Sequence, residues 1–318
     1  MTFGQTLISI AGLISLAGCA NATPDPAAPS PSTYHVYFLG GQSNMDGYGF
    51  NTDLPDALSE PNPDVRIYHG ASVEDGADGG GAGLWAPLQP GHGTGFSSDG
   101  QSNSRSDRFG PELSFAAALP APAEGAGIAI VKFARGGTGL VDGVSGYGSW
   151  DPDYETGNRR NQYDNALTTI NGAFQAGDID GDGSIDRLIP AGILWMQGEA
   201  DAYDSVEAST EYAENVARLM DLLRAALRAD DLPVVLGRIQ DSGDTPDTQV
   251  MAYSAEVQAQ QETYAASDPC AAIVTVTEDF GFLPDGWHYR SEDYLTLGEA
   301  FADAVVQLQP ACGPNAER

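Results

Sequence analysis

Basic residues are scarce in this chain of 318 residues. Lys and Arg number 14 against 45 Asp and Glu, so the formal net charge is −31 at pH 7. A surface with so little positive charge repels nucleic acids and anionic lipid headgroups, and neither is an expected partner. The content of hydrophobic residues is ordinary for a globular protein, and the length suffices for one large core but not for two full domains.

Long apolar runs are also missing, apart from one near the N-terminus. Leu7–Leu16 is too short to span a bilayer but has the length of a signal-peptide core, although no Lys or Arg precedes it. The next residues, L-A-G-C ending at Cys19, resemble a bacterial lipoprotein box, which is cut before the cysteine that becomes lipidated. We therefore predict a lipoprotein-type signal peptide over 1–19, a Pro/Ala/Ser-rich tether over 20–33, and an exported protein. The alternative is an ordinary signal peptide cut nearby.

Cysteine is nearly absent from the rest of the chain. Beyond Cys19 only Cys270 and Cys312 remain, an even pair. In an oxidising cell envelope or outside the cell, such a pair favours a disulfide that ties the last helix to the strand before it. Two unpaired thiols are the alternative.

Apolar segments of strand length alternate with helical patterns from residue 34 to residue 312. This alternation predicts a three-layer α/β/α domain with a mostly parallel, five-stranded sheet, followed by a tail over 313–318. The segment Phe50–Gly110 is rich in Gly, Asp, Ser and Pro, and we expect an irregular insertion beside the functional site. The expected strands are 34–39, 127–133, 191–196, 232–236 and 271–276, and the expected helices are 111–119, 162–175, 206–229, 249–266 and 291–308.

Two glycine-rich turns follow the first two expected strands. The first turn leads into Gln42, Ser43 and Asn44, and the second contains Gly136 and Gly137. Parallel strands deliver such turns to the same edge of a sheet, where free backbone N–H groups can stabilise an oxyanion. Ser43 is therefore a candidate nucleophile, although a capping serine is the commonest alternative at such a position.

A nucleophilic serine needs a general base, and the chain has only four histidines. His35 lies near the start of a strand, at the wrong end, while His69 and His92 lie in the insertion with no nearby group to orient them. His288 follows the fifth expected strand, and Asp285 lies three residues before it. This carboxylate can fix the tautomer of the imidazole, so we predict that Asp285 and His288 act with Ser43. Glu278 and Asp279 are alternative partners.

An acidic loop, D-I-D-G-D-G-S-I-D, precedes the third expected strand. Oxygen-bearing side chains at alternate positions and Gly183 after the third acid match the first half of a calcium loop. Ile189 occupies the twelfth position, so the usual bidentate glutamate is absent and the loop is not an EF-hand. We expect a structural Ca²⁺, and a solvated acidic turn is the alternative. The predicted ligands are Asp178, Asp180, Asp182, Ser184 and Asp186.

Several motifs together resemble the SGNH hydrolase superfamily, and more narrowly its sialate O-acetylesterase and carbohydrate esterase family 6 (acetyl xylan esterase) branch. These motifs, in order, are G-Q-S-N-M at 41–45, F-G-P-E at 109–112, the G-G-T turn at 136–138, W-x-Q-G-E-x-D at 195–201 and D-x-x-H at 285–288. The resemblance covers about residues 34–308. It implies a flavodoxin-like sheet flanked by helices and hydrolysis of acetyl esters on sugars, without a cofactor for catalysis.

The resemblance also assigns roles to individual residues. It implies that Ser43 is the nucleophile, His288 the base and Asp285 its orienting partner. The oxyanion donors would be the Ser43 N–H, the Gly137 N–H and the Gln197 side chain, with Gly136 as the competitor of Gly137. Supporting positions would fall to Gln42, Asn44, Glu199 and Asp201. A non-catalytic carbohydrate-binding surface lipoprotein, and a general lipase or esterase on the same fold, are the alternative functions.

Overall fold

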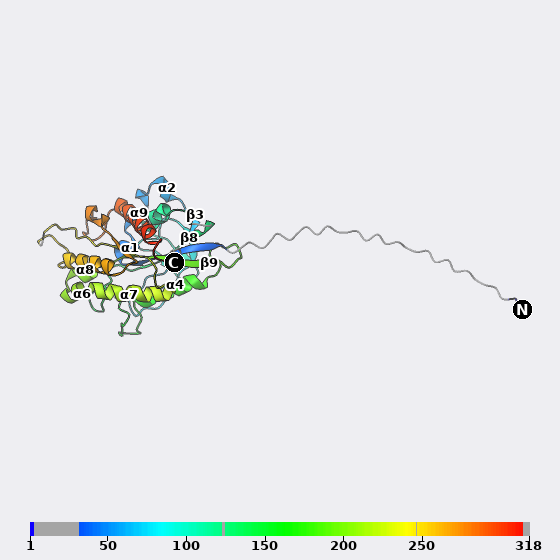
Figure 1. The fold of residues 1–318 in the computed structure, drawn as a ribbon, viewed down its shortest axis with the longest axis horizontal. Coiled ribbons are helices and arrows are strands. Elements are labelled where there is room, and N and C mark those ends of the chain that lie inside the picture. The colour runs from blue at the N-terminus through cyan, green and yellow to red at the C-terminus, as the bar shows by residue number, and fades with distance from the viewer. Residues whose placement is uncertain (3–31, 123–124, 246, 314–318) are drawn as a thin grey trace.

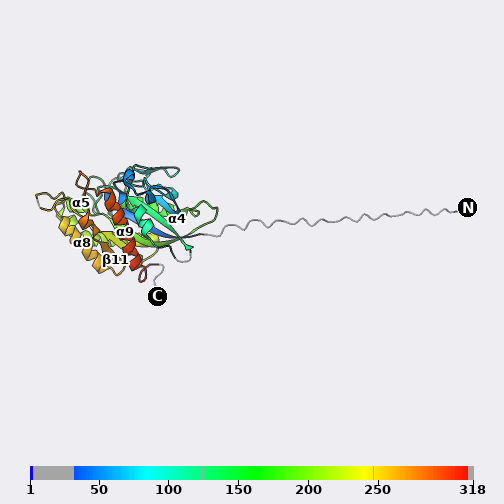
Figure 2. The same ribbon diagram turned by 90° about the horizontal axis from the view of Figure 1, so that it is seen from above.

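The computed structural model describes residues 1–2, 32–122, 125–245 and 247–313. The predicted signal peptide and most of the predicted tether lie outside the described residues, as does the tail beyond Gly313. The remainder forms one sheet with helices on both faces (Figure 1, Figure 2). Within the described part of the chain, no helix has the length and apolarity needed to cross a membrane.

The central sheet has seven strands in the order β11-β10-β9-β1-β8-β3-β4. Every neighbouring pair is parallel except β3 and β4, so the predicted parallel α/β fold is confirmed and the predicted count of five strands is too low. The strands are β1 (Thr33–Gly41), β3 (Asn62–His69), β4 (Trp85–Leu88), β8 (Gly127–Ala134), β9 (Arg187–Met196), β10 (Val234–Gly237) and β11 (Ala271–Val274).

The two additional strands come from the segment that we expected to be irregular. β3 begins with three exposed residues, Asn62, Pro63 and Asp64, and is mostly buried from Val65 onward, where it pairs with β8. Polar and proline residues at its start hide the strand in the local pattern, whereas the long-range pairing that stabilises it is invisible in the sequence. The segment also contains a short helix, α2 (Asp56–Ser59), and takes part in two short ribbons, which are β2 (Gly49–Phe50) with β7 (Arg108–Phe109) and β5 (Ser97–Ser98) with β6 (Asn103–Ser104).

The helices cover both faces of the sheet. α3 packs on α9 at one face, and α4, α7 and α8 lie at the other (Figure 1). α4 begins as predicted because the Asn161 side chain accepts hydrogen bonds from the N–H groups of Tyr163 and Asp164. The expected helix 206–229 is two helices, α6 and α7. The helices are α1 (Ser43–Asp46), α2 (Asp56–Ser59), α3 (Glu112–Ala118), α4 (Gln162–Gln175), α5 (Glu199–Tyr203), α6 (Val206–Thr210), α7 (Tyr212–Leu227), α8 (Ser254–Ser267) and α9 (Ser291–Leu308).

Chain order reverses at β1, which pairs with β8 on one side and with β9 on the other. In open parallel sheets, the carboxyl ends of the strands at such a reversal form the usual ligand-binding crevice. β1 is buried over nearly its whole length, so the segment that follows it is attached to the most rigid part of the core.

The predicted disulfide is confirmed. Cys270 and Cys312 are bonded, with their Cα atoms 5.7 Å apart. The bond joins the chain after α9 to the start of β11, as the sequence indicated.

Candidate active site

Ser43 is positioned by a glycine turn at the end of β1. Gly41 has φ +144°, and a Cβ there would lie 2.0 Å from the Met196 carbonyl oxygen, so only glycine fits. The Gln42 N–H donates to the same carbonyl at 2.9 Å, which fixes the turn against β9. Ser43 is the first residue of α1, and its backbone N–H therefore has no partner inside that helix.

Asp285 and His288 form the predicted pair. The Asp285 Oδ2 lies 2.8 Å from the His288 Nδ1, and Oδ1 accepts the N–H groups of Trp287 at 2.8 Å and His288 at 3.1 Å. The loop that carries both residues closes on itself, because the Leu283 N–H donates to the His288 carbonyl at 2.7 Å. One carboxylate therefore orients both the ring and the backbone of the histidine.

The pKa values of this pair favour a neutral imidazole beside a charged carboxylate. Burial lowers the pKa of His288 below its ordinary value, and the hydrogen bond and charge of Asp285 only partly oppose this effect. Burial acts to raise the pKa of Asp285, but the hydrogen bonds from His288 and from the Trp287 N–H outweigh it, so that pKa is lowered. A neutral imidazole is the form that can accept a proton from a serine hydroxyl.

Two contacts fix the loop that carries His288 against the segment that carries Ser43. The Asn44 Nδ2 donates to the Trp287 carbonyl at 3.1 Å. The ring of Tyr48 stacks on the imidazole of His288, with centroids 3.5 Å apart and an interplanar angle of 5°. The residues on either side of Ser43 and His288 thus meet at one edge of the sheet, although 245 positions separate the two in the sequence.

The second glycine turn lies beside the serine. A Cβ on Gly136 would be 3.4 Å from the Cβ of Ser43, so the Gly136 backbone lies directly against the serine side chain. Gly137 has φ +73°, and a Cβ there would meet the ring of Tyr147 at 2.7 Å. The turn is held by the Thr138 hydroxyl, which donates to the Arg135 carbonyl at 2.8 Å.

The predicted supporting residues form one buried cluster, called here the amide cluster. The Asn44 Nδ2 donates to the Glu199 Oε1 at 2.6 Å, and the Gln42 Oε1 accepts the N–H groups of Gly198 and Ala200 at 3.4 and 3.3 Å. The Tyr294 hydroxyl donates to the Asn44 Oδ1 at 2.8 Å. The amide cluster consists of Gln42, Asn44, Gln197, Glu199 and Asp201.

Gln197 has both of its amide hydrogens engaged within this cluster. Its Nε2 donates to the Thr138 carbonyl at 3.0 Å and to the Asp201 Oδ2 at 2.5 Å, while its Oε1 accepts from the Tyr212 hydroxyl at 3.1 Å. Donation to an oxyanion, the role suggested by the sequence, would require one of these bonds to break. In the structure Gln197 joins the second glycine turn to Asp201.

The two carboxylates of the amide cluster are fully buried. Burial raises the pKa of Asp201 to about 7, against the hydrogen bonds from Gln197 and from the Leu140 N–H. Burial also raises the pKa of Glu199, against the hydrogen bond from Asn44. The Glu199 Oε2 has no hydrogen-bond partner among the described residues.

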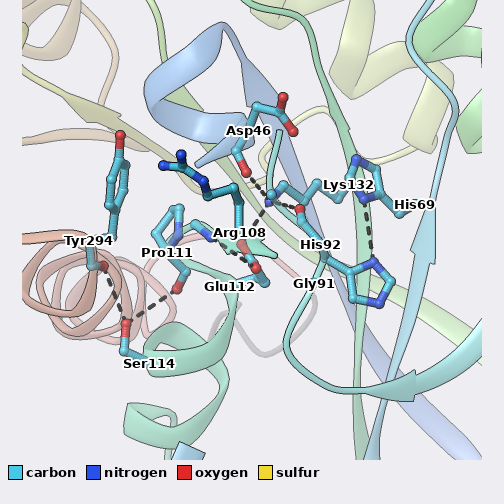
Figure 3. Close-up of polar contacts among 12 residues, drawn as sticks. Asp46, His69, Gly91, His92, Arg108, Pro111, Glu112, Ser114, Lys132 and Tyr294 are labelled. Atoms are coloured by element: carbon cyan, nitrogen blue, oxygen red, sulfur yellow. Dashed lines mark hydrogen bonds and ion pairs between the residues drawn. The ribbon is translucent and has the colours of Figure 1, made fainter. Parts of the chain in front are cut away.

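A second buried cluster lies at the other end of α1 (Figure 3). The chain's single lysine, Lys132, donates at 2.7 Å to the carbonyls of Asp46 and His92 and to the Glu112 Oε2. The side chains of Lys132 and Glu112 are 0% exposed. We call Asp46, His92, Glu112 and Lys132 the lysine cluster. Lys132 was not identified from the sequence, although a lone lysine inside an apolar strand is a visible signal.

His69 and His92 differ from the expectation that nothing orients them. Their Nδ1 atoms lie 3.4 Å apart, and His69 stacks on Phe96 with centroids at 4.0 Å. Burial and the nearby charge of Lys132 lower the pKa of His92 to about 3 and that of His69 well below its ordinary value. Both rings are buried close to Lys132 rather than exposed in a loop, because part of the insertion joins the sheet as β3.

Arg108 brings the end of the predicted insertion to the candidate site. Its Nη1 donates to the Tyr48 carbonyl at 2.7 Å, and its guanidinium carbon lies 3.6 Å from the centre of the Phe50 ring. Its charge also acts to lower the pKa of His288. Neither Arg108 nor Tyr48 was identified from the sequence, because the contacts that place them depend on pairing of β2 with β7.

The acidic loop lies at the opposite end of the strands. Thr33 pairs with Arg187 at the start of β1 and β9, whereas Gly41 pairs with Met196 at the end where the serine turn begins. Among the predicted calcium ligands, Asp178, Asp180 and Asp186 place carboxylate oxygens within 4.8 Å of one another. Asp182 is not part of this group, and its Oδ1 accepts the Ser184 N–H at 2.7 Å.

Comparison with known families gives a match over nearly the whole domain. A family described as "carbohydrate esterase, sialic acid-specific acetylesterase" matches residues 33–307. No curated protein sequence matches the chain.

Solved structures share the fold at low sequence identity. A protein from Arabidopsis thaliana is 20% identical with a TM-score of 0.59, and the alignment covers 87% of this chain and 99% of that one. NanS is 18% identical with a TM-score of 0.55, over 88% of this chain and 98% of its own. A carbohydrate acetylesterase from Xanthomonas citri is 18% identical with a TM-score of 0.54, over 88% of this chain and 56% of its own.

Proposed function

Because the match spans residues 33–307, the chain belongs to the carbohydrate esterases of the sialic acid-specific acetylesterase family, and we propose that it works through an acetyl-enzyme on Ser43. It is a carboxylic ester hydrolase that acts on carbohydrates. The proposed substrates are acetylated sugars such as acetylated xylan, sialic acid or related glycans. The proposed general base is His288, oriented by Asp285.

One observation supports this mechanism above the others. The Asp285–His288 pair, joined at 2.8 Å, is held against the serine segment by the Tyr48 stack and by the hydrogen bond from Asn44 to the Trp287 carbonyl. A serine, a neutral imidazole and a carboxylate in this order are the components of a serine hydrolase.

The reaction has two steps. In the first, His288 takes the hydroxyl proton while the Ser43 Oγ attacks the ester carbonyl carbon, and the sugar alcohol leaves with a proton from the imidazolium. In the second, His288 takes a proton from water as the water oxygen attacks the acetyl carbonyl carbon. The imidazolium then returns that proton to the Ser43 Oγ as the acyl bond breaks and acetic acid is released. Asp285 stabilises the imidazolium in both steps and does not itself become protonated.

The developing oxyanion requires N–H donors. The Ser43 N–H at the start of α1 is one proposed donor, and the glycine turn supplies a second. Gly136 lies directly against the Ser43 Cβ, which supports it beside Gly137 for this role. Gln197 would act as a third donor only if it released Thr138 or Asp201. Its hydrogen bonds to Thr138 and Asp201 favour a role in positioning the glycine turn.

Replacement of the proposed nucleophile tests the mechanism. Ser43→Ala should lower the hydrolysis of p-nitrophenyl acetate by at least about 10³-fold with unchanged folding, since the attacking atom is lost. Ser59→Ala, which changes an exposed serine whose hydroxyl donates to the Asp56 carbonyl within α2, is the control and should keep full activity. A fluorophosphonate probe should label the wild type and the control but not Ser43→Ala. Full activity of Ser43→Ala would end the proposal.

The substrate class needs a separate measurement. A panel of acetylated xylans, acetylated sialosides and simple acyl esters should show higher kcat/KM for acetylated sugars. Equal or higher kcat/KM for long-chain acyl esters would instead indicate a general lipase or esterase on the same fold.

We propose that the protein is exported, either as a lipoprotein of the bacterial cell envelope (periplasm or outer surface) or as a secreted protein. The Cys270–Cys312 disulfide supports an oxidising compartment. Mass analysis of the mature N-terminus tests this. A diacylglyceryl group on Cys19 is expected, and Cys19→Ala should abolish it. A mature chain that begins elsewhere without lipid would contradict the lipoprotein.

A further inference from the structure

The acidic loop 178–186 brings three carboxylates together. Asp178, Asp180 and Asp186 each offer an oxygen, and these oxygens lie within 4.8 Å of one another. Asp178 is exposed, Asp180 is half-buried, and Asp186 is 8% exposed. Surface carboxylates commonly lie near each other without a ligand, so the buried Asp186 is the informative member of this group.

Asp186 is held in place with one oxygen unsatisfied. Its Oδ2 accepts the Ile179 N–H at 2.8 Å, whereas its buried Oδ1 has no hydrogen-bond partner among the described residues. A buried carboxylate oxygen without a donor is unfavourable unless a proton or a cation satisfies it. Here this oxygen belongs to a residue that also faces two further carboxylates.

Among the described residues, no basic side chain forms an ion pair with this group of Asp178, Asp180 and Asp186. Uncharged donors contact the group instead. The Tyr34 hydroxyl donates to the Asp180 Oδ2 at 3.0 Å, and backbone N–H groups of the loop donate to Asp178 and to the Asp180 Oδ1. Three carboxylates this close repel one another, and a bound divalent cation would reverse that repulsion.

We propose that Asp178, Asp180 and Asp186 bind a calcium ion that fixes the start of β9 to the start of β1. An all-oxygen set on a flexible, glycine-containing loop suits Ca²⁺, which accepts irregular shells of six to eight oxygens, better than Mg²⁺, which demands near-ideal octahedral geometry. Asp186 and Asp180 would supply the link, since the former precedes β9 and the latter accepts from Tyr34 in β1.

This site lies at the amino ends of the strands, while Ser43 follows the carboxyl end of β1. The ion therefore acts on stability and not on the ester. The inference is independent of the proposed mechanism, because binding is measured without substrate and the Ser43→Ala variant should bind the ion as the wild type does.

Thermal unfolding and calorimetric titration with Ca²⁺ test the site. For the metal-free full chain, Ca²⁺ at about 100-fold above its Kd should raise Tm by roughly 5–10 °C, with one tight site per chain. Asp186→Asn and Asp178→Asn should each remove the tight site and the shift in Tm. Asp230→Asn, which changes an exposed aspartate in the turn before β10, is the control and should keep both.

The variants also distinguish a specific Ca²⁺ site from nonspecific attraction of Ca²⁺ to the acidic surface. Asp178 is exposed, so Asp178→Asn should fold even if the buried Asp186→Asn does not. Absence of tight binding to the wild type would overturn the proposal. Tight binding retained in Asp178→Asn would overturn it as well.

Terbium luminescence localises the ion. Tb³⁺ replaces Ca²⁺ at oxygen sites, and the Tyr34 ring lies one hydrogen bond from Asp180, so excitation of tyrosine should sensitise the bound ion. Tyr34→Phe should lose most of this emission while keeping the Ca²⁺-induced rise in Tm. Undiminished emission from Tyr34→Phe would place the ion elsewhere and overturn the assignment.

Discussion

The two buried polar clusters at the ends of α1 hold the same short helix by different means. In the lysine cluster, the ammonium of Lys132 donates to two backbone carbonyls and to the carboxylate of Glu112. In the amide cluster, hydrogen bonds join amide side chains to carboxylates, and no lysine or arginine of the described residues contributes. A helix of four residues is unstable alone, so tertiary contacts such as these two clusters must hold it in place.

Substitutions in the two clusters should therefore affect different properties of the protein. A charge in a dry interior needs its partner, so damage to the lysine cluster should appear as lost stability. The amide cluster holds its carboxylates through hydrogen bonds from amide side chains and a backbone N–H, and these bonds fix the geometry around Ser43. Damage to the amide cluster should therefore appear mainly as lost activity. Three substitutions test this contrast.

The largest effect is expected from Lys132→Met. It leaves the Glu112 carboxylate buried without its cation, which should cost about 3–5 kcal/mol of unfolding free energy in urea titrations. Adding Glu112→Gln should recover at least half of the lost unfolding free energy, because the double variant no longer buries an unpaired carboxylate. Arg160→Met, which breaks a pair whose side chains are 55% and 93% exposed, is the control and should change stability by less than about 1 kcal/mol. A loss below that limit for Lys132→Met would remove the distinction between the clusters.

An effect of intermediate size on stability is expected from Asp201→Asn. Both carboxylate oxygens of Asp201 accept the Leu140 N–H, at 2.9 and 3.1 Å, and one also accepts from Gln197. Asp201→Asn replaces one of these two acceptor oxygens with an NH2 group that points at a donor, which should cost about 1–3 kcal/mol. The turn beside Ser43 should shift, so kcat should fall about 10- to 100-fold with little change in KM. Wild-type kinetics in this variant would show that the amide cluster does not position the site.

The same variant has a defined pH dependence. Burial raises the pKa of Asp201 to about 7, so the folded state binds its proton more tightly than the unfolded state does. The contribution of Asp201 to stability is therefore fully present below the ordinary aspartate pKa and declines as pH rises towards 7. The stability difference between wild type and Asp201→Asn should narrow over this range. A difference that widens with pH would contradict the raised pKa.

The smallest effect is expected from Glu199→Gln. Its Oε1 can still accept from Asn44 at 2.6 Å, and the amide nitrogen can occupy the position of Oε2, which has no partner among the described residues. Stability should change by less than about 1 kcal/mol and kcat by less than about threefold, as measured by urea unfolding and steady-state kinetics. A 100-fold loss of kcat would mean that the negative charge of Glu199 takes part in the reaction.

The sequence predicts those parts of the molecule that local patterns encode. The glycine turn at Ser43, the D-x-x-H pair and the capped start of α4 all depend on residues a few positions apart. The lysine cluster depends instead on residues that are distant in the sequence, because Lys132 donates to Glu112 and to two backbone carbonyls. Every residue has a backbone carbonyl, so the sequence does not reveal which carbonyls a lysine contacts. Gln197 is a similar case. The sequence indicated it as a site residue, but the hydrogen bonds from its amide group to Thr138 and Asp201 are tertiary contacts that the sequence does not show. β3 and β4 were missed for that reason as well.

The bond between Cys270 and Cys312 spans 42 positions, and both Asp285 and His288 lie inside that interval. Closing a ring of this size restricts the unfolded chain by about 4 kcal/mol in the entropy model. The ring formed by the disulfide also changes what a single proteolytic cut can release. A protease that cuts once at the exposed Pro284 or Asp285 opens the circle without freeing a fragment, so the histidine stays tethered to the body of the enzyme from its other side.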